Sequence, residues 1–159
     1  MNAHELIHNH QLVLEAFGRW PSFHDAEVHS ALLDRTRKFD NGSFYPSVEL
    51  VIHGWNMTSE ITDKGYYKLE NQNLVHFIFE EVSDLELDGL NHQNVISSLD
   101  LSLQKNKSGE SLFFVELAHC YGLSGSFKAK RASIESVIPY SGEETANPAF
   151  KRDALKRAP

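Results

Sequence analysis

The segment Trp20-Pro21-Ser22-Phe23-His24-Asp25-Ala26-Glu27-Val28 joins a helical pattern to the first strand-like run of the chain. We expect Trp20 and Phe23 to be core anchors that fix the helix against a sheet. Asp25 is expected to close the turn by accepting backbone N–H bonds, with His24 packed beneath the two aromatic rings. The segment is therefore interpreted first as a structural joint between helix and sheet.

Upstream of this joint, apolar residues of positions 3–17 recur at roughly helical spacing. This pattern predicts an amphipathic helix, with His8-Asn9-His10 as the place where it is interrupted. Gly18 is a typical helix stop, and Pro21 prevents the helix from continuing unbroken.

Downstream of the joint, apolar alternation and turn signals predict about seven strands. They are expected at residues 28–33, 47–53, 73–82, 84–88, 95–103, 112–117 and 127–138. Residues 56–69 are polar, with Gly65 beside two tyrosines, and are expected to form a long covering loop. The predicted fold class is mostly β (α+β), an N-terminal helix followed by a curled, largely antiparallel sheet. A barrel-like closure is favoured, and a two-layer arrangement stays open.

Length and composition place the chain among globular proteins. Its 159 residues fit one domain, and 41% hydrophobic with 23% charged residues argue against disorder and against a membrane protein. We expect a single domain over residues 1–140 and a loose tail over residues 141–159. The first residues lack a secretory pattern, so a cytoplasmic location is expected. Cys120 is the only cysteine, which rules out an intramolecular disulfide.

The charge is unevenly distributed. The net charge is -7, and four basic residues against one acidic residue give positions 151–159 a charge of +3, so residues 1–150 carry -10. This excess of carboxylates disfavours binding to nucleic-acid phosphates and suits a basic protein partner. The alternative is ordinary solubility, since many cytosolic domains are acidic.

Two polar clusters are candidate ligand sites. In an extended strand Asp25, Glu27 and His29 share one face while His24 points away, so at most three of the four converge on a metal ion. The alternative is the structural role described above. Residues 91–94, Asn-His-Gln-Asn, could hold a ligand or satisfy the backbone of a tight connection, and the second use is commoner.

Four segments carry a resemblance to a known family. They are Trp20 to Val28 as quoted above, Gly65-Tyr66-Tyr67, Asn91-His92-Gln93-Asn94, and Tyr121-Gly122-Leu123-Ser124-Gly125-Ser126-Phe127. Their order and spacing over residues 5–139 resemble the immunity protein 50 family. The resemblance implies a non-catalytic bacterial protein of the cytoplasm that binds and neutralises a polymorphic toxin, without a cofactor.

The charge balance adds an expectation about that partner. An acidic binder complements a basic toxin such as a nuclease. The candidate contacts are the acidic residues Asp84, Glu86 and Asp88, expected as a ridge on one face of a strand, and Tyr66 and Tyr67 of the long loop.

Two further functions stay open at this point. One is a small metal-dependent hydrolase that uses His24, Asp25, Glu27 and His29. The other is an oligomeric nucleic-acid binder, because a curled sheet with exposed aromatic residues can stack bases. The oligomeric state is not determined by the sequence, and a homo-oligomer remains open.

Overall fold

A computed structural model describes residues 2–140, so the tail expected at 141–159 lies outside the described residues. The elements are η1 (Ala3–Leu6), α1 (Gln11–Phe17), β1 (Glu27–Lys38), β2 (Phe44–Ile61), β3 (Tyr67–Asp88), β4 (Val95–Lys105), β5 (Ser111–Tyr121) and β6 (Ser124–Pro139). No helix between residues 2 and 140 is long and apolar enough to cross a membrane.

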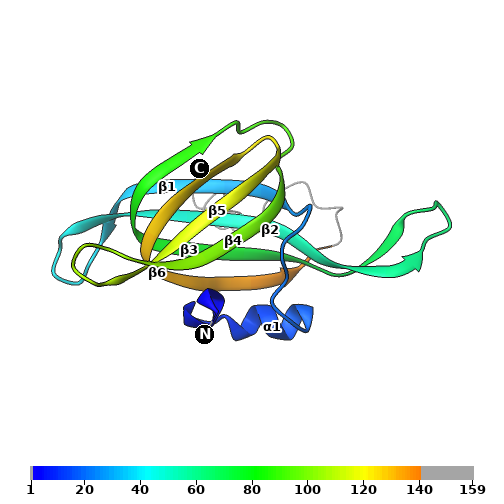
Figure 1. The fold of residues 1–159 in the computed structure, drawn as a ribbon, viewed down its shortest axis with the longest axis horizontal. Helices are drawn as coiled ribbons and strands as arrows, with labels where there is room; N and C mark the ends of the chain where they lie inside the picture. The colour runs from blue at the N-terminus through cyan, green and yellow to red at the C-terminus, as the bar shows by residue number, and fades with distance from the viewer. Residues whose placement is uncertain (1, 141–159) are drawn as a thin grey trace, which may run out of the picture.

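The six strands form one closed antiparallel barrel in the order β1-β2-β3-β6-β5-β4 (Figure 1). This confirms the mostly β fold and the barrel that the alternation favoured. The count is six because the predicted strands 73–82 and 84–88 are one continuous strand, β3. A positive φ at Asp84 and a register shift between Ser83 and Glu86 bend that strand without ending it.

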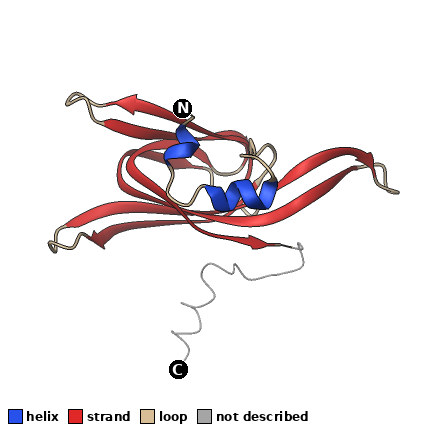
Figure 2. Ribbon diagram, turned by 90° about the horizontal axis from the view of Figure 1, so that it is seen from below, coloured by secondary structure: helices blue, strands red, loops and turns tan. Residues whose placement is uncertain are grey.

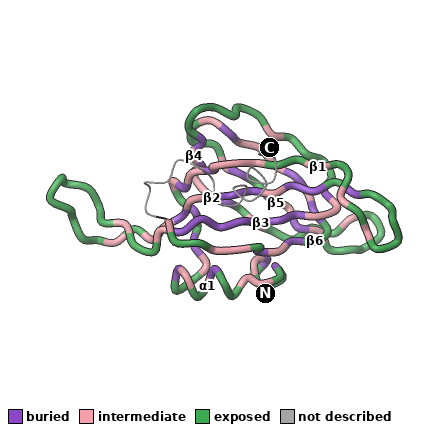
Figure 3. The backbone as a smooth tube through the Cα atoms, turned by 180° about the vertical axis from the view of Figure 1, so that it is seen from behind, coloured by how far each residue is buried: buried purple, intermediate pink, exposed green. Residues whose placement is uncertain are grey.

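The prediction of a long loop over residues 56–69 is wrong. β2 continues to Ile61 and β3 begins at Tyr67, so most of the segment is a two-stranded hairpin. Its polar composition is typical of loops. A two-stranded ribbon that leaves the barrel is solvated, however, so its strands need no alternation of buried apolar and exposed polar residues. Figure 3 shows this contrast, with buried backbone along the middle of β2 and β3 and exposed backbone at the hairpin tips.

The N-terminal pattern folds as two short helices, interrupted where the sequence predicted. Asn9 has a φ of +63°, and His8 forms a parallel bridge with Ser133 of β6. The His8 N–H donates to the Ala132 carbonyl at 3.0 Å, and the Ile134 N–H donates to the His8 carbonyl at 2.8 Å. The two helices thereby lie across the barrel, as the view from below shows (Figure 2).

The core is aromatic and continuous with the joint at Trp20 to Val28. Phe77 and Phe79 stack at 5.8 Å between ring centroids, and Phe127 meets Phe79 edge-on at 5.1 Å. Phe23 is fully buried and packs on Phe77 at 5.8 Å. A Cβ at Gly54 would lie 3.0 Å from the Phe23 ring, so the glycine leaves the space that this ring occupies.

The joint also closes the barrel. β1 and β4 pair only through Glu27 and Val95 in the described structure, but three backbone bonds from the joint, two to β4 and one to the residue before it, support the seam. They are Val28 N–H to the Asn94 carbonyl at 2.8 Å, Ile96 N–H to the Ala26 carbonyl at 2.9 Å, and Leu99 N–H to the Ser22 carbonyl at 3.1 Å.

Two expectations about the joint are wrong. Asp25 accepts no backbone hydrogen bond within the described chain; the Ser22 hydroxyl accepts the His24 N–H instead, at 3.2 Å. The His24 ring is not beneath the aromatic rings but exposed, with Nδ1 hydrogen-bonded to the Ser97 carbonyl at 2.9 Å. Trp20 and Phe23 do pack against the core, as expected.

Candidate functional site

The acidic residues predicted as a ridge lie in the exposed last residues of β3. The register shift between Ser83 and Glu86 is a β-bulge that divides them. Asp84 belongs to the bulge, has a φ of +51°, and pairs with Lys128 of β6 at 3.3 Å. Glu86 and Asp88 follow the bulge, two residues apart with half-buried Leu87 between them, and share the outer face. Asp84 is therefore neutralised locally, whereas Glu86 and Asp88 have no cationic partner in the described structure.

The strand register places further carboxylates beside Glu86. Glu86 lies opposite Ser126 of β6, Ser126 opposite Glu116 of β5, and Glu116 opposite Asp100 of β4. Cross-strand partners point to the same side of a sheet. The residues next to them in each strand point into the core, so these carboxylates point outward. We define the acidic face as Glu86, Asp88, Asp100 and Glu116.

No member of the acidic face makes an ion pair or side-chain hydrogen bond with another described residue. Like charges on adjacent strands repel, so this face costs stability that other contacts must offset. Sequence reasoning missed Asp100 and Glu116 because each is an isolated carboxylate in its own strand. Only the pairing of β3, β6, β5 and β4 brings them together.

The predicted aromatic contacts lie at the other end of β3. Tyr67 is its first residue, and Tyr66 belongs to the turn before it; 55% and 71% of their surfaces are exposed. The turn is held by the Thr62 N–H, which donates to the Tyr66 carbonyl at 2.7 Å. The structure therefore separates the two groups of predicted contact residues by the length of β3.

The four residues proposed as a metal site form two separate pairs. His24 Nε2 lies 3.4 Å from Asp25 Oδ2, and His29 Nε2 lies 3.5 Å from Glu27 Oε1. Asp25 has a φ of +61° and β1 begins only at Glu27, so the strand alternation that would align Asp25 with Glu27 and His29 does not reach it. Across residues 2–140 no three His, Cys, Asp or Glu side chains are arranged to hold a metal ion.

His29 belongs instead to an aromatic junction between β1, β2 and the end of β6. Its ring lies 5.8 Å from that of His53 and 5.2 Å from that of Tyr140. Burial lowers the pKa of His29, and the nearby Glu27 carboxylate opposes that shift. Burial also lowers the pKa of His53, whose Nε2 lies 3.1 Å from Gln72 Oε1.

The polar residues 91–94 satisfy the backbone of a tight connection. The buried Asn94 accepts the N–H groups of Asn91 and Leu123 at 2.9 and 3.0 Å and donates to the Asn91 carbonyl at 2.9 Å. The side chain of Asn94 thereby ties the β3–β4 connection to the β5–β6 turn. All its polar atoms are used internally, which favours the structural alternative.

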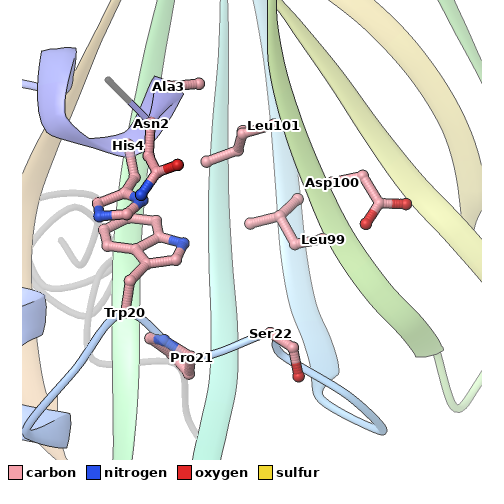
Figure 4. A pocket seen from close by; sticks show the side chains of 9 residues that line it. All are labelled: Asn2, Ala3, His4, Trp20, Pro21, Ser22, Leu99, Asp100 and Leu101. Atoms are coloured by element: carbon pink, nitrogen blue, oxygen red, sulfur yellow. The ribbon is translucent and has the colours of Figure 1, made fainter.

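A groove of about 380 Å³ lies beside the seam, between the N-terminal segment and β4 (Figure 4). The rings of His4 and Trp20 stack there at 4.7 Å, facing Leu99 and Leu101, while the Asp100 carboxylate points away from them. Burial lowers the pKa of His4, with Glu5 opposing. The residues that line the groove are those that pack the joint against β4. The lining contains no set of reactive side chains that point toward one common position.

A family model described as immunity protein 50 matches residues 9–140 of the chain. No curated protein and no solved structure gives a significant match. The matched range contains the whole barrel, the joint and all the predicted contact residues.

Proposed function

The chain belongs to the immunity protein 50 family, and from this membership we propose that it is a non-catalytic immunity protein that binds and neutralises a polymorphic toxin. The family match over the barrel is the observation that carries the proposal. The cell that makes both proteins would be bacterial, and the immunity protein would act in its cytoplasm, where the toxin acts. No cofactor is needed, because inhibition requires only a stable complex.

We further propose that the toxin is basic, as many nucleases are. The support is electrostatic: residues 1–150 carry a net charge of -10, and the acidic face concentrates four carboxylates that have no ion-pair or hydrogen-bond partner among residues 2–140. A uniform field of one sign attracts an oppositely charged protein and raises its association rate by 10-fold to 10³-fold at low salt.

The two other functions considered from the sequence gain no specific support. The candidate metal ligands remain in two pairs, and the acidic face would repel nucleic-acid phosphates. We therefore retain only the immunity function.

The test is calorimetry and co-purification with the toxin domain encoded beside this gene, together with growth protection when that domain is expressed. We expect tight binding and survival. A chain that neither binds nor protects against that domain would contradict the proposed function.

The role of the acidic face is tested separately with Glu86→Lys/Glu116→Lys. We expect the association rate at low salt to fall by at least roughly 10-fold and its salt dependence to weaken. The matched control is Glu15→Lys/Asp40→Lys, which changes the net charge equally at exposed positions away from the acidic face. Equal effects of the two variants would assign the steering to net charge alone.

A further inference from the structure

The hairpin formed by β2 and β3 extends beyond the barrel at the right of Figure 1. β1 pairs with β2 only as far as His53, and β6 pairs with β3 only from Asn73. We define the arm as residues 56–72, which therefore have only each other as strand neighbours within residues 2–140. At its base the Asn56 side chain donates to the Phe17 carbonyl, and the Tyr140 N–H donates to the Gln72 carbonyl.

The arm has one apolar face. Met57 lies opposite Leu69, and Ile61 lies opposite Tyr67. β2 has a register irregularity between Met57 and Ile61, so alternation is followed along β3, where Leu69 and Tyr67 are two residues apart and point to the same side. Since partners across a ladder share a side, Met57 and Ile61 lie on that face with them. Met57, Ile61 and Tyr67 are 47%, 59% and 55% exposed, so nothing within the described structure covers that face.

The opposite face is polar and internally satisfied. Lys68 Nζ lies 3.5 Å from Glu60 Oε2, and the Thr58 hydroxyl donates to the Lys68 carbonyl at 2.9 Å. These contacts belong to a surface that faces water. The ribbon is thus amphipathic, although its apolar side chains take no part in the barrel core.

Both outer edges of the arm also lack a strand neighbour in the part of the chain that the structure describes. A strand edge that lacks a neighbour presents unpaired N–H and C=O groups, and natural proteins usually shorten, charge or cover such edges. A two-stranded hairpin by itself is only marginally stable in water. An apolar face that no described residue covers, with two edges that no described strand pairs, therefore indicates a surface suited to contact with another protein.

We propose that the arm inserts its apolar face, Met57, Ile61, Leu69 and Tyr67, into an apolar cleft of the cognate toxin. This inference rests on the proposed function and names the binding element for it. A projecting ribbon is convex on all sides, so its complement is concave. Binding in a cleft would cover the apolar face and both open edges at once.

A second copy of the chain is a poorer occupant. A stable dimer buries about 800 Å² on each partner. The contact between two such arms through three half-exposed side chains falls well short of that area. A cleft can instead enclose the faces, edges and tip of the ribbon together.

The arm and the acidic face would then contribute to different rate constants. Apolar anchors that become buried in a partner mainly set the dissociation rate, whereas surface charges mainly set the association rate. The two surfaces lie at opposite ends of β3, so variants of one leave the other unchanged.

The experiment measures binding kinetics with the purified toxin domain encoded beside this gene. For Ile61→Ser/Tyr67→Ser we expect the dissociation rate to rise by at least roughly 30-fold, because central apolar anchors typically dominate binding energy. The matched control is Glu60→Ser/Lys68→Ser, which removes a pair from the polar face without changing net charge. We expect less than roughly a 3-fold change for the control.

Thermal unfolding checks that both variants remain folded, and Met57→Ser serves as a milder second variant on the apolar face. Wild-type dissociation kinetics in both apolar-face variants would overturn the inference and leave the proposed function intact. A wild-type chain that does not bind the toxin domain would overturn both. A wild-type dimer that Ile61→Ser/Tyr67→Ser converts to monomer by sedimentation would make a second copy the occupant and overturn the toxin assignment.

Discussion

Single side chains join the loops of this barrel to one another through hydrogen bonds, and Asn94 is the clearest case. It is 6% exposed and makes three hydrogen bonds to backbone groups of two separate loops. An amide is suited to this position because it presents an acceptor and a donor at once. Asp25 is a contrasting case, since it contributes a left-handed backbone and its side chain makes only an exposed contact with His24 within the described residues.

Replacement of Asn94 tests the first role. Asn94→Ala leaves the N–H groups of Asn91 and Leu123 without their acceptor, so we expect the free energy of unfolding to fall by about 2–3 kcal/mol. Urea denaturation measures the change. His92→Ala is the control: the residue is exposed, hydrogen-bonds its neighbour Asn91 and meets the ring of exposed Tyr121 edge-on, and we expect a change below about 0.5 kcal/mol. Equal stability of Asn94→Ala and the wild type would refute the bridging role.

A series at Asp25 tests the second role. With a φ of +61°, the position suits Asn or Gly as well as Asp. We expect Asp25→Asn and Asp25→Gly to change the free energy of unfolding by less than about 0.5 kcal/mol, and Asp25→Ala to lower it by about 1 kcal/mol. Chemical denaturation of the three variants gives the comparison. A similar loss in all three would restore a role for the carboxylate.

Among the elements, β3 is the one that links the two proposed binding surfaces. It is 22 residues long, with the arm at its start and acidic residues at its end. Its pairing with β6 contains a register shift between Ser83 and Glu86, and Gly125 of β6 lies beside that shift, where the two backbones approach closely. A Cβ on Gly125 would lie 1.9 Å from the Glu86 carbonyl oxygen.

Substitution of Gly125 tests whether this approach is needed. The φ of Gly125 is +143°, and the clash is with backbone that cannot rotate away. We therefore expect Gly125→Ala to lower the free energy of unfolding by at least about 3 kcal/mol. Gly109→Ala is the matched control, because Gly109 also has a positive φ but open space around it; the expected loss is about 1 kcal/mol. Comparable losses in urea denaturation would show that backbone conformation alone matters.

At the scale of the whole molecule, the aromatic junction of His29, His53 and Tyr140 brings together β1, β2 and the end of β6. The pKa values of both histidines lie below the ordinary 6.5, chiefly because burial disfavours their charged forms. The unfolded chain binds these protons near pH 6.5, whereas the folded chain binds them only at lower pH. Stability from this source is therefore complete above about pH 6.5 and is lost as the pH falls through the lower folded values.

This coupling predicts the pH dependence of folding. We expect the free energy of unfolding to be smaller at pH 5.5 than at pH 7.5, and the difference to shrink in His29→Gln/His53→Gln. Urea denaturation at the two pH values measures both. A double variant with the wild-type pH dependence would show that other groups cause it.

Much of the fold could be predicted from local patterns, and the failures have physical reasons. The helix interruption at residues 8–10, the hairpin turns and the barrel preference followed from spacing and turn chemistry. The arm was expected to be a loop because its residues are polar, although two strands that pair only with each other need no buried pattern. Half of the acidic face was found, Glu86 and Asp88, because those two are neighbours in one strand.

Local alternation, turn residues and the four family segments determined the strands, the joint at Trp20 to Val28 and the family, since these depend on neighbours in sequence. Only the tertiary structure decided that Asp100 and Glu116 join Glu86, and that Met57 faces Leu69 while Ile61 faces Tyr67. Register between strands is set by the packing of the whole core and by bulges such as that at Asp84. A shift of one residue in strand pairing would move the side chains of either surface to the opposite face of the sheet. The pairing register that prevents this shift cannot be read from any single strand.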